Sequence, residues 1–177
     1  MKPLYNKIDY RHFFVILQAL NIFINEVMRI LIQRVDEASV KIDNQIKSAI
    51  LKGLLVLVGI EDTDTMMDSE WLAGKVIGLR IFDDENGVMN RSVLEVEGEI
   101  LVVSQFTLHA MTRKGNRPSY IKAANHEIAI PLYGHFCREL SLKLGKEVQT
   151  GTFAADMKVS LVNNGPVTIW IDSKNKE

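Results

Sequence analysis

Cysteine is almost absent from this sequence, whose 177 residues include only Cys137. A single thiol excludes an internal disulfide framework and is typical of a protein that works in a reducing compartment. An excess of one charge is lacking too, because 21 Lys and Arg residues are offset by 22 Asp and Glu residues. A nucleic acid partner would therefore have to bind a local basic patch rather than respond to a global positive field.

The usual signatures of metal and nucleotide sites are also missing. The four histidines, at positions 12, 109, 126 and 135, have no metal-ligand spacing. The glycines form neither a dinucleotide fingerprint nor a P-loop. We therefore interpret the histidines as structural or surface residues and Cys137 as a small core residue, and we expect no metal and no cofactor.

The length and the apolar pattern predict one α+β domain with more sheet than helix. Strands are expected at 29–35, 39–46, 52–60, 81–82, 99–106, 147–152, 157–163 and 167–172, and helices at 64–79 and 125–144. Asp36 and Glu37 are expected to join the first two strands. Pro131 and Gly134 are expected to kink the second helix or delay its first half.

The first 27 residues differ from the rest. They contain HFFVILQALNIFI at 12–24, an apolar run that is too short to span a bilayer. Met28 then opens MRILIQRV, a typical start of a strand. We expect 1–27 to be a non-native or dispensable extension and 28–177 to be the functional domain; the alternative is a real extra helix packed on the body.

Two segments carry candidate chemistry. In SQFTLHA at 104–110, Thr107 and His109 would share one face of a strand and could form a nucleophile and base, although Thr is also an ordinary strand residue. The loop MTRKGNRP at 111–118 holds Arg113, Lys114 and Arg117. This loop is either simply solvated or a clamp for nucleic acid phosphates, and the residues alone leave both interpretations open.

SQFTLHA at 104–110 and NNGPVT at 163–168, the latter preceded by QTGTFAADMKVSLV, resemble the two signature motifs of D-aminoacyl-tRNA deacylases, also called D-tyrosyl-tRNA deacylases. MRILIQRVDEASV, GLLVLVGIE and RPSY extend the resemblance over 28–172. It implies a single α+β domain whose mainly antiparallel or mixed sheet curls into a barrel-like roll with two main helices. It also implies a cytoplasmic homodimer, with active sites at the interface, that hydrolyses the ester between a D-amino acid and the 3′-terminal adenosine of tRNA.

The resemblance also assigns site residues. Gly165 and Pro166 would form a cis pair that projects from one subunit into the active site of the other, oriented by Arg34. The backbone of this pair would act as a wall that excludes the Cβ of an L-residue but admits glycine. Glycyl-tRNA, including glycine mischarged on tRNA-Ala, is therefore an expected substrate. The pocket for the adenosine and the aminoacyl group would be lined by Ser104, Gln105, Phe106, Thr107 and Met157.

No credible acid, base or nucleophile accompanies these motifs. We therefore expect the substrate 2′-OH to assist the reaction and the backbone amides of Phe106 and Thr107 to stabilise the oxyanion. The sequence departs from the family pattern at Asn164, where an acidic residue is usual, and at His109. We expect Asn164 to alter a turn contact and not the wall.

Three other functions remain as alternatives. A Thr-dependent esterase would use Thr107 and His109 on free D-amino acid esters. A non-catalytic RNA-binding module would resemble the editing domain of some archaeal threonyl-tRNA synthetases. A metal hydrolase lacks ligands in the sequence.

Overall fold

A six-stranded mixed sheet, a small two-stranded sheet (β4 and β5) and two α-helices form the computed structural model, which describes residues 28–176. The predicted extension and His12 lie outside the described residues. The elements in chain order are β1 (Arg29–Ile42), β2 (Gln45–Ile50), β3 (Gly53–Gly59), α2 (Met66–Gly78), β4 (Phe82–Asp83), β5 (Met89–Arg91), β6 (Glu99–Ser104), the 3₁₀ turn η1 (Phe106–His109), α3 (His126–Leu144), β7 (Gln149–Thr150) and β8 (Lys158–Asp172).

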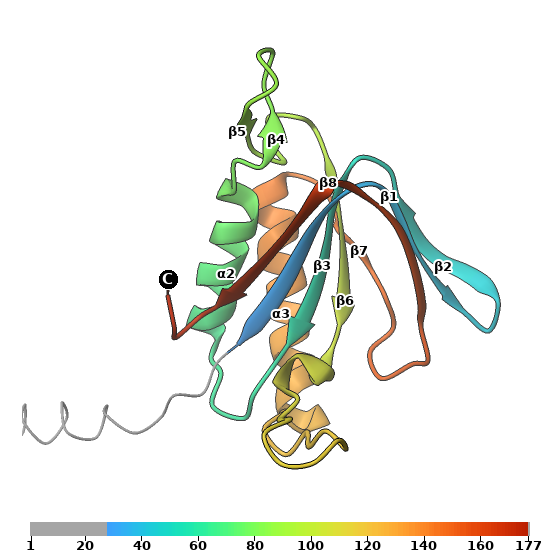
Figure 1. The fold of residues 1–177 in the computed structure, drawn as a ribbon, viewed down its shortest axis with the longest axis vertical. Coiled ribbons are helices and arrows are strands. Elements are labelled where there is room, and N and C mark those ends of the chain that lie inside the picture. The colour runs from blue at the N-terminus through green and yellow to red at the C-terminus, as the bar shows by residue number, and fades with distance from the viewer. Residues whose placement is uncertain (1–27, 177) are drawn as a thin grey trace, which may run out of the picture.

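The sheet has the strand order β2-β1-β3-β6-β7, and β8 pairs along β1. The pairs β3–β6 and β6–β7 are parallel and the others are antiparallel. In Figure 1, β1 and β8 run side by side and bend together at one end of the molecule, so that the sheet curls. The expected α+β fold, with a mixed, barrel-like sheet and two main helices, is confirmed.

Both helices cover the same face of the sheet (Figure 1). The larger hydrophobic core lies between the two helices and the sheet. It includes Ile30, Val56, Val102 and Phe136. A second cluster, which includes Val40, Leu55 and Leu101, fills the curl made by β2 and the first half of β8. Leu55 and Leu101 alternate with the side chains that face the helices, as the two-residue period of a strand requires.

Two long strands replace four shorter predicted ones. β1 continues through Asp36 and Glu37, and β8 continues through the Asn-Gly-Pro stretch that was predicted to separate two strands. The β1–β8 register shifts between Gln33 and Val35 and again between Val35 and Glu37. The polar residues therefore mark irregularities within a continuous pair, not its ends.

The second helix, α3, begins directly after its predicted N-cap residue, Asn125. The Asn125 side chain accepts hydrogen bonds from the backbone of Glu127 at 2.9 Å and of Ile128 at 3.2 Å. The helix ends at Gly145, whose φ of 75° is the left-handed conformation typical of a helix C-terminus. Pro131 lies inside α3, so the expectation of a delayed start was wrong. No helix within residues 28–176 has both the length and the apolar character needed to cross a membrane.

Candidate active site

The first motif forms a strand end and a turn. β6 ends at Ser104, the Gln105 amide donates to the Val58 carbonyl at 2.6 Å, and Phe106 to His109 form the 3₁₀ turn η1. The premise that Thr107 and His109 share a strand face was therefore wrong. The Thr107 hydroxyl instead accepts a hydrogen bond from Gln105 Nε2 at 2.6 Å.

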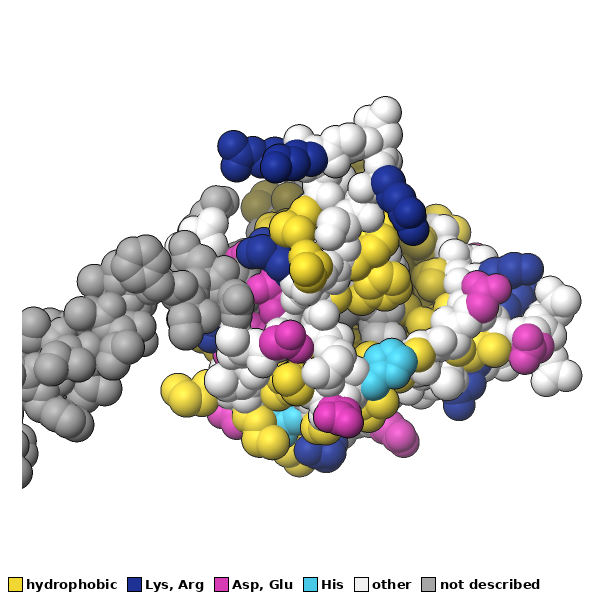
Figure 2. Space-filling view, turned by 90° about the horizontal axis from the view of Figure 1, so that it is seen from below, with side chains coloured by type: hydrophobic (Ala, Val, Ile, Leu, Met, Phe, Trp, Pro, Cys, Tyr) yellow, Lys and Arg dark blue, Asp and Glu magenta, His cyan; other side chains and the backbone are white. Residues whose placement is uncertain are grey.

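A cavity of about 970 Å³ opens beside this turn. Of the predicted pocket residues, Ser104, Gln105, Phe106 and Met157 line it, whereas Thr107 is not among the lining residues. Figure 2 looks toward the end of the molecule at which β3 and β6 finish and shows a hollow with hydrophobic side chains on its floor. Its size and apolar lining are those of a small-molecule site.

The far wall of the cavity was not predicted from the sequence. It includes Ala123, Ala124, His126 and Phe153. His126 lies edge-on to Phe153, with 5.6 Å between the ring centroids. Phe153 lies within the quoted motif segment, which was a signal for its proximity, but nothing in the sequence pointed to His126 as a pocket residue.

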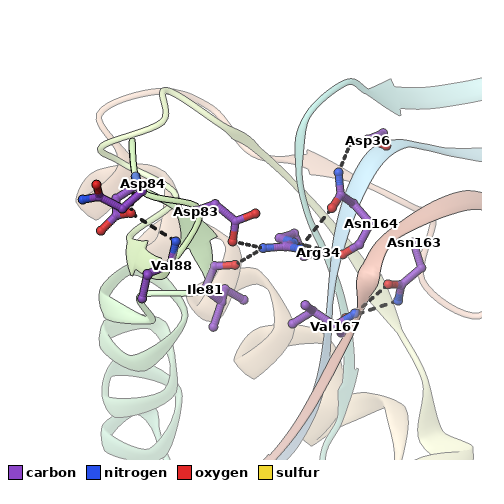
Figure 3. Close-up of polar contacts among 10 residues, drawn as sticks. Arg34, Asp36, Ile81, Asp83, Asp84, Val88, Asn163, Asn164 and Val167 are labelled. Atoms are coloured by element: carbon purple, nitrogen blue, oxygen red, sulfur yellow. Dashed lines mark hydrogen bonds and ion pairs between the residues drawn. The ribbon is translucent and has the colours of Figure 1, made fainter.

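Arg34 and the second motif meet at the bend of β1 and β8. Arg34, which is only 7% exposed, donates through Nε to the Asn164 carbonyl at 2.9 Å and through Nη2 to Asn164 Oδ1 at 3.0 Å. Its Nη1 donates to the Ile81 carbonyl at 2.6 Å and lies 3.2 Å from Asp83 Oδ1 (Figure 3). Arg34 therefore ties the bend to the segment that leads into β4.

The peptide bond between Gly165 and Pro166 is cis, as the resemblance implied. The side chain of Asn164 does more than the predicted turn contact. Besides accepting from Arg34, its Nδ2 donates to Asp36 Oδ1 at 2.6 Å. Two side chains of β1, Arg34 and Asp36, thus hold Asn164, the residue directly before Gly165.

The bend and the cavity lie at opposite ends of the sheet within one chain. Arg34 pairs with Leu54 near the start of β3, whereas the cavity opens at Val58 near its end. The four residue steps from Leu54 to Val58 span roughly 13 Å of strand. The structure therefore brings Ser104, Gln105, Phe106 and Met157 together and keeps Arg34, Gly165 and Pro166 apart from them.

The basic loop is fixed at its base. Met111 and Ser119 exchange backbone hydrogen bonds of 2.8 and 3.0 Å, and the neighbouring Tyr120 packs edge-on against Phe106 with 5.0 Å between centroids. Arg113, Lys114 and Arg117 are exposed and form no ion pair with any residue in 28–176. Three cations that form no ion pair within this described range thus lie on a loop whose base borders the cavity.

The cysteine and two of the histidines lie in surroundings typical of residues that stabilise the fold. Burial raises the pKa of the Cys137 thiol to about 11, so it is protonated at neutral pH. His109 is 1% exposed, and its Nδ1 lies 2.8 Å from Glu61 Oε1. His135 lies 3.3 Å from Glu70 on the helix surface. Among the described residues, no group of three or more His, Cys, Asp or Glu side chains is placed to hold a metal ion.

The chain is similar to known deacylases over nearly all of the described part. The sequence model of the family described as D-Tyr-tRNA(Tyr) deacylase matches residues 31–172. A D-aminoacyl-tRNA deacylase of Parabacteroides distasonis is 71% identical over 150 residues, which are 85% of this chain and all of that protein. That of Phocaeicola vulgatus is 68% identical with the same coverage.

Two solved structures share the fold of this chain. One, described as c-Myc DNA Unwinding Element Binding Protein, has a TM-score of 0.77 and 39% identity, covering 81% of this chain and 97% of the other. A second, described as a probable eukaryotic D-amino acid tRNA deacylase, has a TM-score of 0.72 at 19% identity, covers 82% of this chain and 99% of the other, and so supports the fold alone. With the family model matched over most of its length and relatives about 70% identical, the chain belongs to the D-Tyr-tRNA(Tyr) deacylase family.

Proposed function

We propose that this protein hydrolyses the ester bond of D-aminoacyl-tRNA, releasing the D-amino acid and free tRNA, as a cytoplasmic proofreading step of translation. The observation that carries the proposal is the apolar cavity lined by Ser104, Gln105, Phe106 and Met157, which lie in the sequence segments that resemble the family's motifs. Its volume of about 970 Å³ is enough for a terminal adenosine with its aminoacyl group.

The basic loop would hold the rest of the tRNA end. Arg113, Lys114 and Arg117 are free of intramolecular ion pairs within 28–176, and the loop's base packs through Tyr120 against Phe106 at the cavity. Phosphates of the acceptor strand would therefore meet these cations while the terminal adenosine enters the cavity. The contacts position the tRNA without reading its sequence.

A second copy of the chain would complete the site. Because the bend with Gly165 and Pro166 lies at the other end of the sheet from the cavity, one chain cannot place that pair beside its own bound substrate. The sheet face opposite the helices offers a surface for such a partner. Leu31 and Leu57 are partly exposed there and pair on neighbouring strands, and Trp170, opposite Leu31 on β8, is 47% exposed. We propose a homodimer with its active sites at the interface.

Rejection of L-substrates would come from backbone. In the dimer, the Gly165–Pro166 backbone of one copy would stand beside the substrate α-carbon held by the other. An L-residue would drive its Cβ into this wall, whereas a D-residue would point its side chain away. Glycine has no Cβ, so glycyl-tRNA would also be hydrolysed.

Hydrolysis would rely on positioning and on backbone donors. The first hydrogen bond of η1 runs from the Leu108 amide to the Gln105 carbonyl at 3.2 Å, so the amides of Phe106 and Thr107 precede the first donor of the turn. They are free to stabilise the oxyanion that forms when water attacks the ester carbonyl. The acyl C–O bond then breaks, and the proton lost by the attacking water passes through the neighbouring 2′-OH to the leaving 3′ oxygen.

The direct test follows deacylation of D-Tyr-tRNA, L-Tyr-tRNA and Gly-tRNA-Ala side by side, with the full chain and with a chain that begins at Met28. We expect the D and glycyl esters to be cleaved, the L ester to be spared, and both chain lengths to behave alike. Cleavage of the L ester at the D rate would refute selection by the wall. No cleavage by either form would refute the enzyme assignment, and activity of the full chain alone would show that 1–27 is required.

The esterase alternative finds no support in the contacts of its two residues. His109 is buried against Glu61, and the Thr107 hydroxyl is bonded to Gln105. If free D-tyrosine esters were cleaved as fast as D-Tyr-tRNA, that alternative would nevertheless replace ours.

A further inference from the structure

A buried histidine and a buried glutamate are in contact at the end of η1, the turn that carries the proposed oxyanion donors. His109 and Glu61 are each 1% exposed, and His109 Nδ1 lies 2.8 Å from Glu61 Oε1. Arg29 joins them, with Nη1 donating to the Leu108 carbonyl at 3.2 Å and lying 3.5 Å from His109 Nδ1. Burying such groups is costly unless they are paired, so this contact fixes both side chains.

The pair connects two walls of the cavity. His109 ends η1, which begins with Phe106 and Thr107. Glu61 forms a backbone bridge with Ala123, and the amide of Ala124 donates to the Ile60 carbonyl at 2.8 Å. Ala123 and Ala124 line the same cavity as Phe106. One side-chain contact therefore joins the turn to the facing segment.

The Nε2 edge of the His109 imidazole packs closely against Gly59. A Cβ added to Gly59 would lie 2.8 Å from His109 Nε2, so the ring lies directly against the β3 backbone. Burial lowers the pKa of His109, and the charge of Arg29 acts in the same direction, while the Gly59 backbone and Glu61 oppose them. A neutral ring would donate from Nδ1 to the Glu61 carboxylate.

We propose that His109 is a positioning residue of this enzyme: through Glu61, it fixes η1 so that the Phe106 and Thr107 amides face the ester carbonyl. The inference rests on the proposed deacylase function and adds a residue to it. Tight placement matters because a displacement of about 1 Å can cost roughly 100-fold in rate.

The test compares four variants of the full chain. His109→Leu keeps an apolar side chain but removes the donor, His109→Asn returns an N–H near the position of Nδ1, and Glu61→Gln changes the acceptor. His135→Leu is the matched control, because it breaks a second histidine–glutamate contact, His135 to Glu70 at 3.3 Å, away from the cavity.

With D-Tyr-tRNA, we expect His109→Leu to lower kcat roughly 10- to 100-fold with little change in KM, because the substrate still binds and only the donors move. His109→Asn should recover most of kcat, Glu61→Gln should lower it, and His135→Leu should leave it unchanged. If His109→Leu raised KM without lowering kcat, or if His109→Asn did not restore kcat, the positioning role would be overturned.

Amide hydrogen exchange gives a readout that does not depend on activity. His109→Leu should speed exchange in 104–111 and leave the middle of α3 protected. Unchanged exchange in 104–111, or an equal increase throughout 29–172, would reduce His109 to an ordinary core residue and overturn the proposal. If the wild type cleaves no D-aminoacyl ester, the proposed function fails, while the exchange comparison still decides whether His109 fixes the turn.

Discussion

Arg34 binds Asn164 at two atoms, the backbone carbonyl at 2.9 Å through Nε and the side-chain Oδ1 at 3.0 Å through Nη2. The remaining nitrogen donates to the Ile81 carbonyl at 2.6 Å. One guanidinium thus holds the residue before Gly165 on one side and the segment before β4 on the other (Figure 3). Its planar fork is needed for this, because an ammonium is a point donor.

Arg34→Lys should therefore loosen the bend while keeping the positive charge. We expect the ratio of D-Tyr-tRNA to L-Tyr-tRNA hydrolysis to fall at least about tenfold, since one hydrogen bond from a charged group contributes roughly 1.5–3 kcal/mol. Initial rates with both esters measure this ratio. Asp83→Asn is the control, because Asp83 is half exposed and the variant keeps an oxygen acceptor; a wild-type ratio in Arg34→Lys would contradict the role of the fork.

The sequence identified Arg34 and the motif residues only through resemblance, while local patterns misplaced the elements around them. Asp36–Glu37 and Asn-Gly-Pro have the composition of turns, yet β1 and β8 run through both, because pairing along the two strands outweighs local preference. Residues 106–109 form a 3₁₀ turn although Phe and Thr favour strands. In all three segments, which lie at or beside the proposed site, the secondary structure differs from the one that the local sequence favours.

Thr107 should contribute mainly backbone to the reaction. Thr107→Ala removes the hydroxyl that accepts from Gln105 Nε2, and we expect kcat to fall by less than about tenfold, because a neutral hydrogen bond contributes roughly 0.5–1.5 kcal/mol. A tRNA ending in 2′-deoxyadenosine should in contrast be a poor substrate. Single-turnover rates with both changes give the comparison, and a large loss in Thr107→Ala with normal turnover of the deoxy substrate would favour a Thr nucleophile.

Asp64 should make stability depend on pH. Burial raises its pKa from 3.8 to about 7, so the folded state keeps a proton that the unfolded chain releases at about pH 4. Stability attributable to Asp64 therefore falls as pH rises from about 4 to 7. Asp64→Asn should remove this loss, because its amide oxygen can still accept from the Glu61 amide, which lies 2.7 Å from Asp64 Oδ2.

The measurement is the difference in Tm between Asp64→Asn and the wild type across pH 4 to 8. The difference is needed because His109, whose pKa is lowered by burial, acts in the opposite sense over part of this range. We expect the Tm of Asp64→Asn, relative to that of the wild type, to increase from pH 4 to 7 and then level off. A constant difference would mean that the Asp64 carboxyl titrates normally in the folded protein.

The contacts that complete the site join residues far apart in the sequence. His109 meets Glu61 and His126 meets Phe153 only after β3, β6 and α3 have packed. The sequence predicts both histidines to be structural or surface residues, because spacing alone gives no reason to pair either with a partner. A motif can therefore predict the lining of one wall of a cavity, while the facing wall follows from tertiary packing.

Gly151 controls the position of Met157 in the cavity. A Cβ on Gly151 would collide with Met157 Sδ, which is the flexible end of a side chain and can move. Gly151→Ala should therefore push Met157 toward the cavity with little loss of stability. We expect KM for D-Tyr-tRNA to rise about tenfold, since overpacking costs roughly 1–3 kcal/mol, and KM for glycyl-tRNA to rise less.

Two further variants decide the cause. Gly74→Ala, in the interior of α2 with open space at its Cβ, should leave both KM values unchanged. Gly151→Ala combined with Met157→Ala should restore KM toward that of Met157→Ala alone, because the colliding sulfur is gone and the two sites are coupled only through it. If instead the effects of Gly151→Ala and Met157→Ala simply add, the glycine acts through the backbone directly after β7, where its amide donates to the Val102 carbonyl at 3.1 Å, and not through the methionine.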